Sequence, residues 1–106
     1  MNNQDRIQLL LQFVKDDPSD PFNLYALGLE YQKENSDQAK YYFDELLKNH
    51  DLYVPTYYHA AILYSELGET EKAIEILTKG IQVSLKQQDF KTQRELQTLL
   101  TNLSFE

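Results

Sequence analysis

Leu24-x-x-Leu27-Gly28-x-x-Tyr31 is followed by Ala39-x-x-x-Phe43, and the pattern returns as Tyr57-x-x-Ala60-Ala61-x-x-Tyr64 followed by Ala73-x-x-x-Leu77. The two tyrosines that close the first motifs are 33 positions apart, and the alanines that open the second motifs are 34 apart. Self-similarity at such a period is typical of stacked helical hairpins, each of which buries its apolar face against a neighbour. The sequence therefore predicts an all-α array built from two hairpins.

Composition sets the class of protein. A chain of 106 residues with 42% hydrophobic residues is long enough for one domain with a core. The net charge of −7 disfavours nucleic acid and anionic membrane surfaces, because both bind through cationic side chains. There is no cysteine, which excludes disulfides and thiolate metal sites. The polar start and the lack of a long apolar run predict neither a signal peptide nor a membrane span, so we expect a cytoplasmic protein.

Breaks in the apolar periodicity divide the single predicted domain, residues 1–106, into four parts. They are an N-terminal helix over 4–16, a first repeat over 21–52, a second repeat over 54–87 and a capping helix over 89–103. Proline ends the first helix, since it removes a backbone donor and extends the residue before it. Glycine at position 68 suits a helix end, and Gly80, inside a predicted helix, indicates a close packing contact.

Side chains at the start of each helix indicate how it is capped. Asp20 is placed to cap a helix that starts at Pro21 and runs to about residue 34, and Asp89 to cap the last helix. Ser36 or Asp37 is predicted to cap the second helix of the first repeat. Thr70 is predicted to cap the second helix of the second repeat.

The repeated motifs resemble the tetratricopeptide repeat, whose pattern is W-x₂-L-G-x₂-Y, then A-x₃-F, then a later proline. Leu24 and Tyr57 occupy the tryptophan slot, and the proline is absent after both copies. The resemblance implies a right-handed α-α superhelix of two hairpins with a flanking helix at each end, as in a small stand-alone bacterial-type protein of the family. It is specific over residues 21–84 and looser at both ends.

Small residues in the family slots let paired helices approach, and bulky residues fill the space around the contact. The predicted packing residues are Leu24, Leu27, Gly28, Tyr31, Ala39, Phe43, Tyr57, Ala60, Ala61, Tyr64, Ala73 and Leu77.

A second apolar stripe follows the first helix of each repeat, about 130° from the packing stripe at ~100° per residue. In the family this helix face lines a concave groove, so the resemblance implies a floor of Tyr25, Leu29, Tyr58 and Ile62. The full candidate groove is Phe22, Tyr25, Leu29, Gln32, Lys33, Tyr58, Ile62, Ser65 and Glu66. Two alternatives stay open: the closing helix covers the stripe through Leu96, Leu99 and Leu103, or a second copy of the chain covers it in a homodimer.

The resemblance implies non-enzymatic binding of a peptide or partner helix. The clamp with which some members hold an acidic peptide terminus is absent, because Tyr25, Leu29 and His59 stand at its positions. We therefore expect a neutral, hydrophobic or basic partner segment, and no cofactor.

Catalysis and metal binding are poorly supported by the residues. His50 and His59 are the only histidines and lack metal-site spacing. A metal-assisted hydrolase built on either histidine is the third hypothesis.

Overall fold

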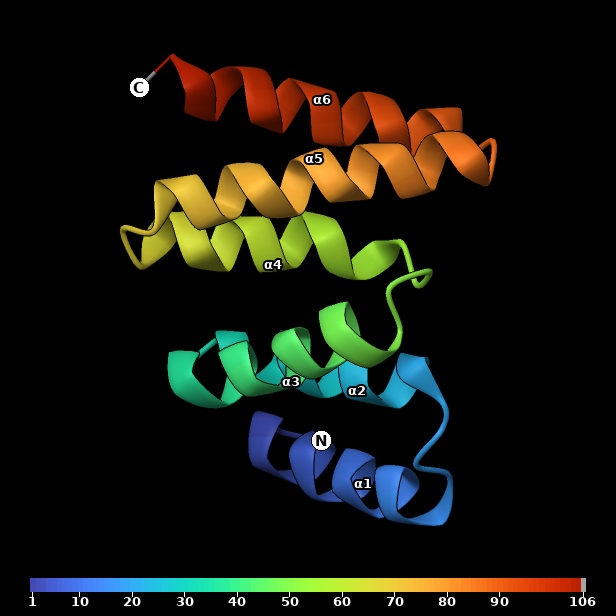
Figure 1. The fold of residues 1–106 in the computed structure, drawn as a ribbon. Coiled ribbons are helices and arrows are strands. Elements are labelled where there is room, and N and C mark those ends of the chain that lie inside the picture. The colour runs from blue at the N-terminus through green and yellow to red at the C-terminus, as the bar shows by residue number, and fades with distance from the viewer. Residues whose placement is uncertain (106) are drawn as a thin grey trace. The chain divides into compact units, whose positions relative to one another are not determined.

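The computed structural model describes residues 1–105, which form six helices and contain no strand. The helices are α1 (Asn3–Asp16), α2 (Pro21–Gln32), α3 (Ser36–Asn49), α4 (Pro55–Glu66), α5 (Thr70–Lys86) and α6 (Phe90–Ser104). Figure 1 shows them following one another along the chain. The predicted all-α fold is confirmed, and the helix breaks lie close to the predicted ones, although α2 ends at Gln32 rather than near residue 34.

Two of the four predicted caps are correct. Asp20 accepts a hydrogen bond from the Phe22 N–H at 2.9 Å, and Asp89 accepts one from the Thr92 N–H at 3.1 Å. The prediction of Ser36 or Asp37 for α3 is wrong: Asn35 is the N-cap, and its side chain accepts from the Gln38 N–H at 3.2 Å. A capping side chain precedes the first helical residue, whereas Ser36 and Asp37 lie within the first turn.

The predicted capping role of Thr70 is also wrong. Thr70 is the first residue of α5, so the N-cap position falls on Glu69, whose side chain makes no capping hydrogen bond. At the end of α4, Gly68 has a φ of +81°, the left-handed conformation that glycine adopts without strain.

The chain divides into two compact units, Met1–Tyr53 with α1 to α3 and a second unit that begins at Val54 and holds α4 to α6. In the first unit α2 packs against both α1 and α3. The core of this unit includes Ile7 of α1 and the fully buried Phe43 of α3. A Cβ added at Gly28 would lie 2.8 Å from Phe43 Cδ1, so the absence of a side chain there lets α2 and α3 approach.

In the second unit α5 packs against both α4 and α6. Gly80 lies where the three helices meet: a Cβ at this position would be 2.7 Å from Tyr57 Cβ in α4 and 3.0 Å from Leu96 Cδ1 in α6. The close contact predicted for Gly80 is therefore present. Its carbonyl accepts a hydrogen bond from the buried Ser84 hydroxyl at 2.6 Å.

The structure buries eleven of the twelve predicted packing residues, and Tyr31 is half-buried. Tyr31 stacks on Tyr42, with ring centroids 5.7 Å apart and planes inclined by 4°.

Candidate functional site

The candidate groove residues fall on both units. The α2 group consists of Phe22, Tyr25, Leu29, Gln32 and Lys33, and the α4 group of Tyr58, Ile62, Ser65 and Glu66. In the first unit they begin right after the Asp20 cap, which fixes the start of α2. Phe22 is 56% exposed, whereas Tyr25 and Leu29 are half-buried one and two turns further along. The α2 group thus offers an apolar surface that is partly accessible to a partner.

Tyr25 is held in place by a second tyrosine that the sequence analysis did not single out. The Tyr25 and Tyr53 rings contact edge to face, with centroids 5.6 Å apart and planes inclined by 62°. Burial raises the pKa of Tyr25, and the neighbouring Tyr53 raises it further. Burial likewise raises the pKa of Tyr53, to which the nearby Asp20 charge adds. Both hydroxyls therefore stay neutral and can donate hydrogen bonds at physiological pH.

The edge residues Gln32 and Lys33 occupy the last turn of α2 and its C-cap. Gln32 is half-buried, and the Lys33 ammonium forms an ion pair with Glu30 at 3.1 Å. The positive charge of Lys33 is therefore directed at its own helix.

Glu30 joins α2 to α1. Its carboxylate accepts from Arg6 Nε at 2.8 Å and from Asn3 Nδ2 at 2.6 Å, and its side chain is only 14% exposed. The Arg6 hydrogen bond is the main reason why the pKa of Glu30 falls to about 2, and Lys33 and Asn3 lower it further. The sequence analysis missed this network, because partners 24 and 27 positions away leave no periodic signal.

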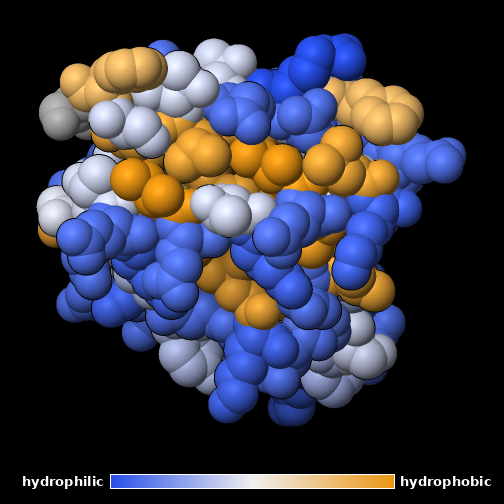
Figure 2. Space-filling view, turned by 45° about the horizontal axis from the view of Figure 1, so that its top comes forward, coloured by the Kyte–Doolittle hydropathy of each residue, from blue (hydrophilic) through white to orange (hydrophobic). Residues whose placement is uncertain are grey.

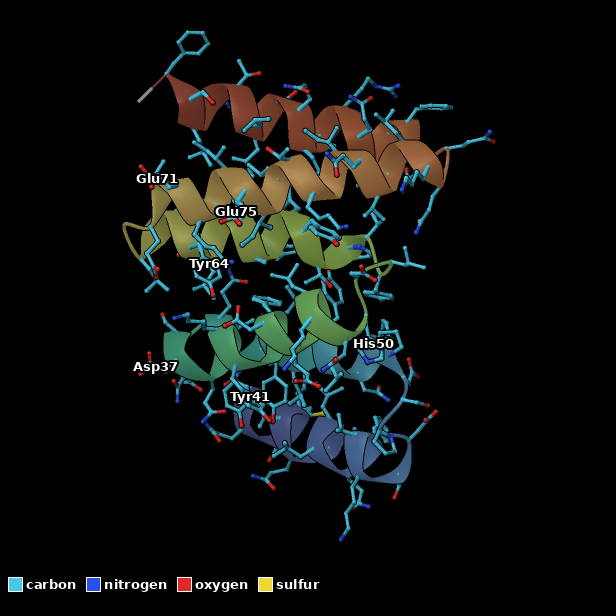
Figure 3. The ribbon with its side chains drawn as sticks, in the orientation of Figure 1. Asp37, Tyr41, His50, Tyr64, Glu71 and Glu75 are labelled. Carbon is cyan, nitrogen blue, oxygen red and sulfur yellow. The ribbon has the colours of Figure 1, made fainter. Side chains whose placement is uncertain are left out.

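A pocket lies at one end of the first unit, where α3 stops and α2 starts. Its volume is about 400 Å³, and it is lined by Pro21, Asn49, His50, Asp51, Leu52 and Tyr53. His50 is labelled at this end of α3 in Figure 3. The sequence analysis placed all of these residues except Tyr53 within the first repeat but did not bring them together, because only the fold places the end of α3 beside the start of α2.

In the second unit the α4 group is also partly accessible. Tyr58 is 39% exposed, Ile62 and Ser65 are half-buried, and Glu66 is exposed. The Tyr58 ring lies edge-on to the His59 ring at 5.5 Å. Burial lowers the pKa of His59, which keeps this imidazole neutral at pH 7.

The closing helix α6 packs chiefly against α5 and touches α4 only slightly. Leu96 and Leu103 are buried, and Leu99 is half-buried. Since Tyr58 keeps its exposure with α6 in place, these leucines do not hide the α4 group, contrary to the first alternative drawn from the sequence.

Figure 2 shows a band of hydrophobic side chains between rows of hydrophilic ones in the region of α5 and α6. Near the end of α5 and the start of α6, Leu85 is 47% and Phe90 is 53% exposed. The second unit therefore carries exposed apolar surface beyond the α4 group.

The part of the chain that the structure describes holds no group of three or more histidine, cysteine, aspartate or glutamate side chains arranged to bind a metal ion. Within the same residues, no helix combines the length and the apolar character that crossing a membrane requires.

Comparisons with known proteins bear on the family. The tetratricopeptide repeat profile matches residues 56–79. The solution NMR structure of a tetratricopeptide repeat domain protein from Salinibacter ruber is 39% identical in sequence, with a TM-score of 0.78, and the match covers 82% of this chain and 89% of that one. A crystal structure of a tetratricopeptide repeat domain protein from the same organism is 37% identical, with a TM-score of 0.77, and covers 80% of this chain and 97% of that one. The search of curated proteins gave no match.

Proposed function

Because the chain belongs to the tetratricopeptide repeat family, whose domains generally act as protein-interaction modules, we propose that it binds a peptide or a helix of a partner protein through the apolar faces of α2 and α4. The binding residues are the α2 group, with Tyr25 and Leu29 at its centre, and the α4 group, with Tyr58 and Ile62. The proposed role is that of a small adaptor in the cytoplasm, without a catalytic step.

The observation that supports this proposal is the partial exposure of equivalent tyrosines on the first helix of each repeat. Tyr25 is half-buried, and Tyr58 is 39% exposed. Tyrosine suits a binding surface because it combines a broad apolar ring with a hydroxyl and loses little conformational entropy when it is ordered. The net charge of −7 favours a neutral, hydrophobic or basic partner segment over an acidic one.

A quantitative pull-down from native lysate tests the proposal, with Tyr25→Ala, Tyr58→Ala and the double variant beside the wild type. Central tyrosines at interfaces often contribute 2 kcal/mol or more, so we expect each single variant to weaken binding about tenfold or more. Tyr41→Ala is the matched control, because Tyr41 is 61% exposed on α3, outside both groups. Undiminished recovery of partners by the double variant contradicts the proposal.

Self-association is the second candidate function, because Phe22 and Tyr58 leave exposed apolar surface on the same faces, which a second copy of the chain can cover. Light scattering after size-exclusion chromatography separates the two candidates. A binding module for other proteins is expected to elute as a monomer of 12.5 kDa. A dimer that dissociates when Tyr25 and Tyr58 are replaced would instead place the two tyrosine faces in the self-association contact.

A further inference from the structure

The pocket at the end of the first unit is built from that unit alone, where α3 meets the start of α2. The pocket is shallow and open to solvent, and its volume of about 400 Å³ is near the lower end of the range for ligand sites, roughly 300–1,000 Å³. A pocket of this size suits one or two side chains of a partner.

The walls of this pocket are fixed by hydrogen bonds and ring contacts. The His50 N–H donates to the Leu46 carbonyl at 2.8 Å, and the Tyr53 N–H donates to the His50 carbonyl at 2.9 Å. The Tyr53 ring is held by its contact with Tyr25. A site that is already ordered loses little entropy when a ligand enters.

The charges around the pocket are negative on balance, because two carboxylates, Asp20 and Asp51, outweigh the partly positive N-terminal end of α2, which begins at Pro21 and is capped by Asp20. The carbonyl end of α3, a helix of 14 residues, carries a partial negative charge at Asn49 and His50. Asp51 is part of the lining, and the nearby Asp20 acts on the Tyr53 hydroxyl, whose pKa it helps to raise. None of the six lining residues is lysine or arginine. The pocket therefore favours a cation.

The chemistry of the walls narrows the choice of cation. Leu52 is 68% exposed and lines the pocket together with Tyr53 and Asp51, so apolar surface and a carboxylate lie close together. A guanidinium group is planar, stacks on aromatic rings and pairs with carboxylates, whereas an ammonium group is compact and strongly hydrated.

We propose that this pocket receives an arginine side chain of the partner segment, with its guanidinium group against Tyr53 and near Asp20 and Asp51, and with an apolar neighbour of that arginine on Leu52. The assignment rests on the proposed protein-binding function and specifies the chemistry of the partner.

An NMR titration of the full chain labelled with ¹⁵N tests the assignment. The probes are N-acetyl-arginine methylamide and the matched citrulline and lysine compounds. Citrulline keeps the shape of arginine without its charge, and lysine keeps the charge without the planar group. We expect the arginine compound to shift the amide signals of Phe22 and residues 49–53, with a dissociation constant on the order of 1–10 mM. The citrulline compound is expected to bind about tenfold more weakly, and the lysine compound less well than arginine.

Asp20→Asn is the sharpest variant, because asparagine also caps helices, so the substitution removes the charge and keeps the capping bond. It is expected to weaken binding of the arginine compound about three- to tenfold. Asp37→Asn is the matched control, since it makes the same change of charge in the first turn of α3, at the opposite end of that helix. It is expected to leave the affinity unchanged.

Three results overturn the assignment. The first is the absence of any shift of these signals at about 50 mM probe, well above the expected dissociation constant. The second is equal affinity for the arginine compound and either analogue, and the third is an equal loss of affinity in Asp20→Asn and Asp37→Asn.

Failure of the arginine assignment is distinguishable from failure of the proposed function. If the tyrosine variants lose the partner while the arginine compound does not bind, only the arginine assignment is wrong. If arginine binds as expected while the double tyrosine variant recovers its partners fully, the proposed faces on α2 and α4 are wrong.

Discussion

Replacing Gly80 by alanine sets two opposing effects against each other. In a helix interior, alanine is favoured over glycine by about 1 kcal/mol. The new Cβ, however, would lie 2.7 Å from both Cβ and Cγ of Tyr57 and 3.0 Å from Leu96 Cδ1. Ordinary contacts between such atoms lie at 3.4–4 Å, so the neighbours must retreat by roughly half an ångström or more, and tightly packed interiors resist such shifts.

Tyr57 cannot easily move away from the added methyl group. Its Cβ is bonded to the α4 backbone, so a rotamer change cannot move it, and its side chain is 1% exposed. Overpacking of this kind costs about 1–3 kcal/mol. Since α4 and α6 both contact this position, we take the upper part of that range and expect Gly80→Ala to lower the free energy of unfolding by about 1–2 kcal/mol after the gain in helix propensity.

Urea unfolding followed by far-ultraviolet circular dichroism measures this change. With a slope of about 1–3 kcal/mol per molar urea, a loss of that size moves the midpoint by roughly 0.3–2 M. Lys79→Ala is the matched control on the exposed side of the same helix, and it is expected to stay within about 0.5 kcal/mol of the wild type. A more stable Gly80→Ala protein would refute the reasoning, because helix propensity alone would then decide the outcome.

Three further predictions concern the first unit. Glu30→Gln is expected to destabilise it by about 1 kcal/mol at neutral pH, a modest value because Arg6 is 38% exposed and water screens the pair. Since folding lowers the pKa of Glu30 to about 2 from 4.5, its contribution is complete above pH 4.5 and declines as the pH falls towards 2. Urea midpoints of wild type and variant should therefore converge in that window, and a gap that stays constant contradicts the assigned role. Asn35→Ala is expected to cost about 1 kcal/mol and Ser36→Ala less than about 0.5, measured by thermal unfolding, and the reverse order would restore Ser36 as the cap. Ala39→Leu is expected to cost about 1–3 kcal/mol in urea unfolding, because Ala39 is fully buried, and a neutral effect would mean that the pair of helices has room to adjust.

The sequence predicted most of the helices and their packing faces, because these depend on neighbours within one or two turns. Apolar spacing fixes which stripe of a helix is buried, as the complete burial of Leu27 and Leu77 illustrates. Proline and glycine mark the breaks because they restrict or extend the allowed backbone conformations. The capping of α3 was assigned one or two residues late, since asparagine, serine and aspartate follow one another and any of them can cap a helix.

The candidate site was only partly predictable. Periodicity identified Tyr25 and Tyr58 as members of a second stripe, and their partial exposure agrees with that pattern. The closing helix was a more difficult case. Its apolar stripe of Leu96, Leu99 and Leu103 requires a partner, but the stripe alone does not say whether that partner is α4 or α5. In the structure this stripe packs mainly against α5, where the missing side chain at Gly80 leaves room for Leu96.

The amino-acid sequence by itself determined that this protein is a pair of helical hairpins with flanking helices, since repeat length, small residues and helix breaks are all local features. Only the tertiary structure decided that Glu30 binds Arg6 and Asn3, that Tyr53 supports Tyr25, and that the end of α3 forms a pocket with the start of α2. These contacts join residues that lie 24 to 32 positions apart in the sequence. Their distances depend on helix crossing and side-chain rotamers, which leave no trace in the spacing of residues along the chain.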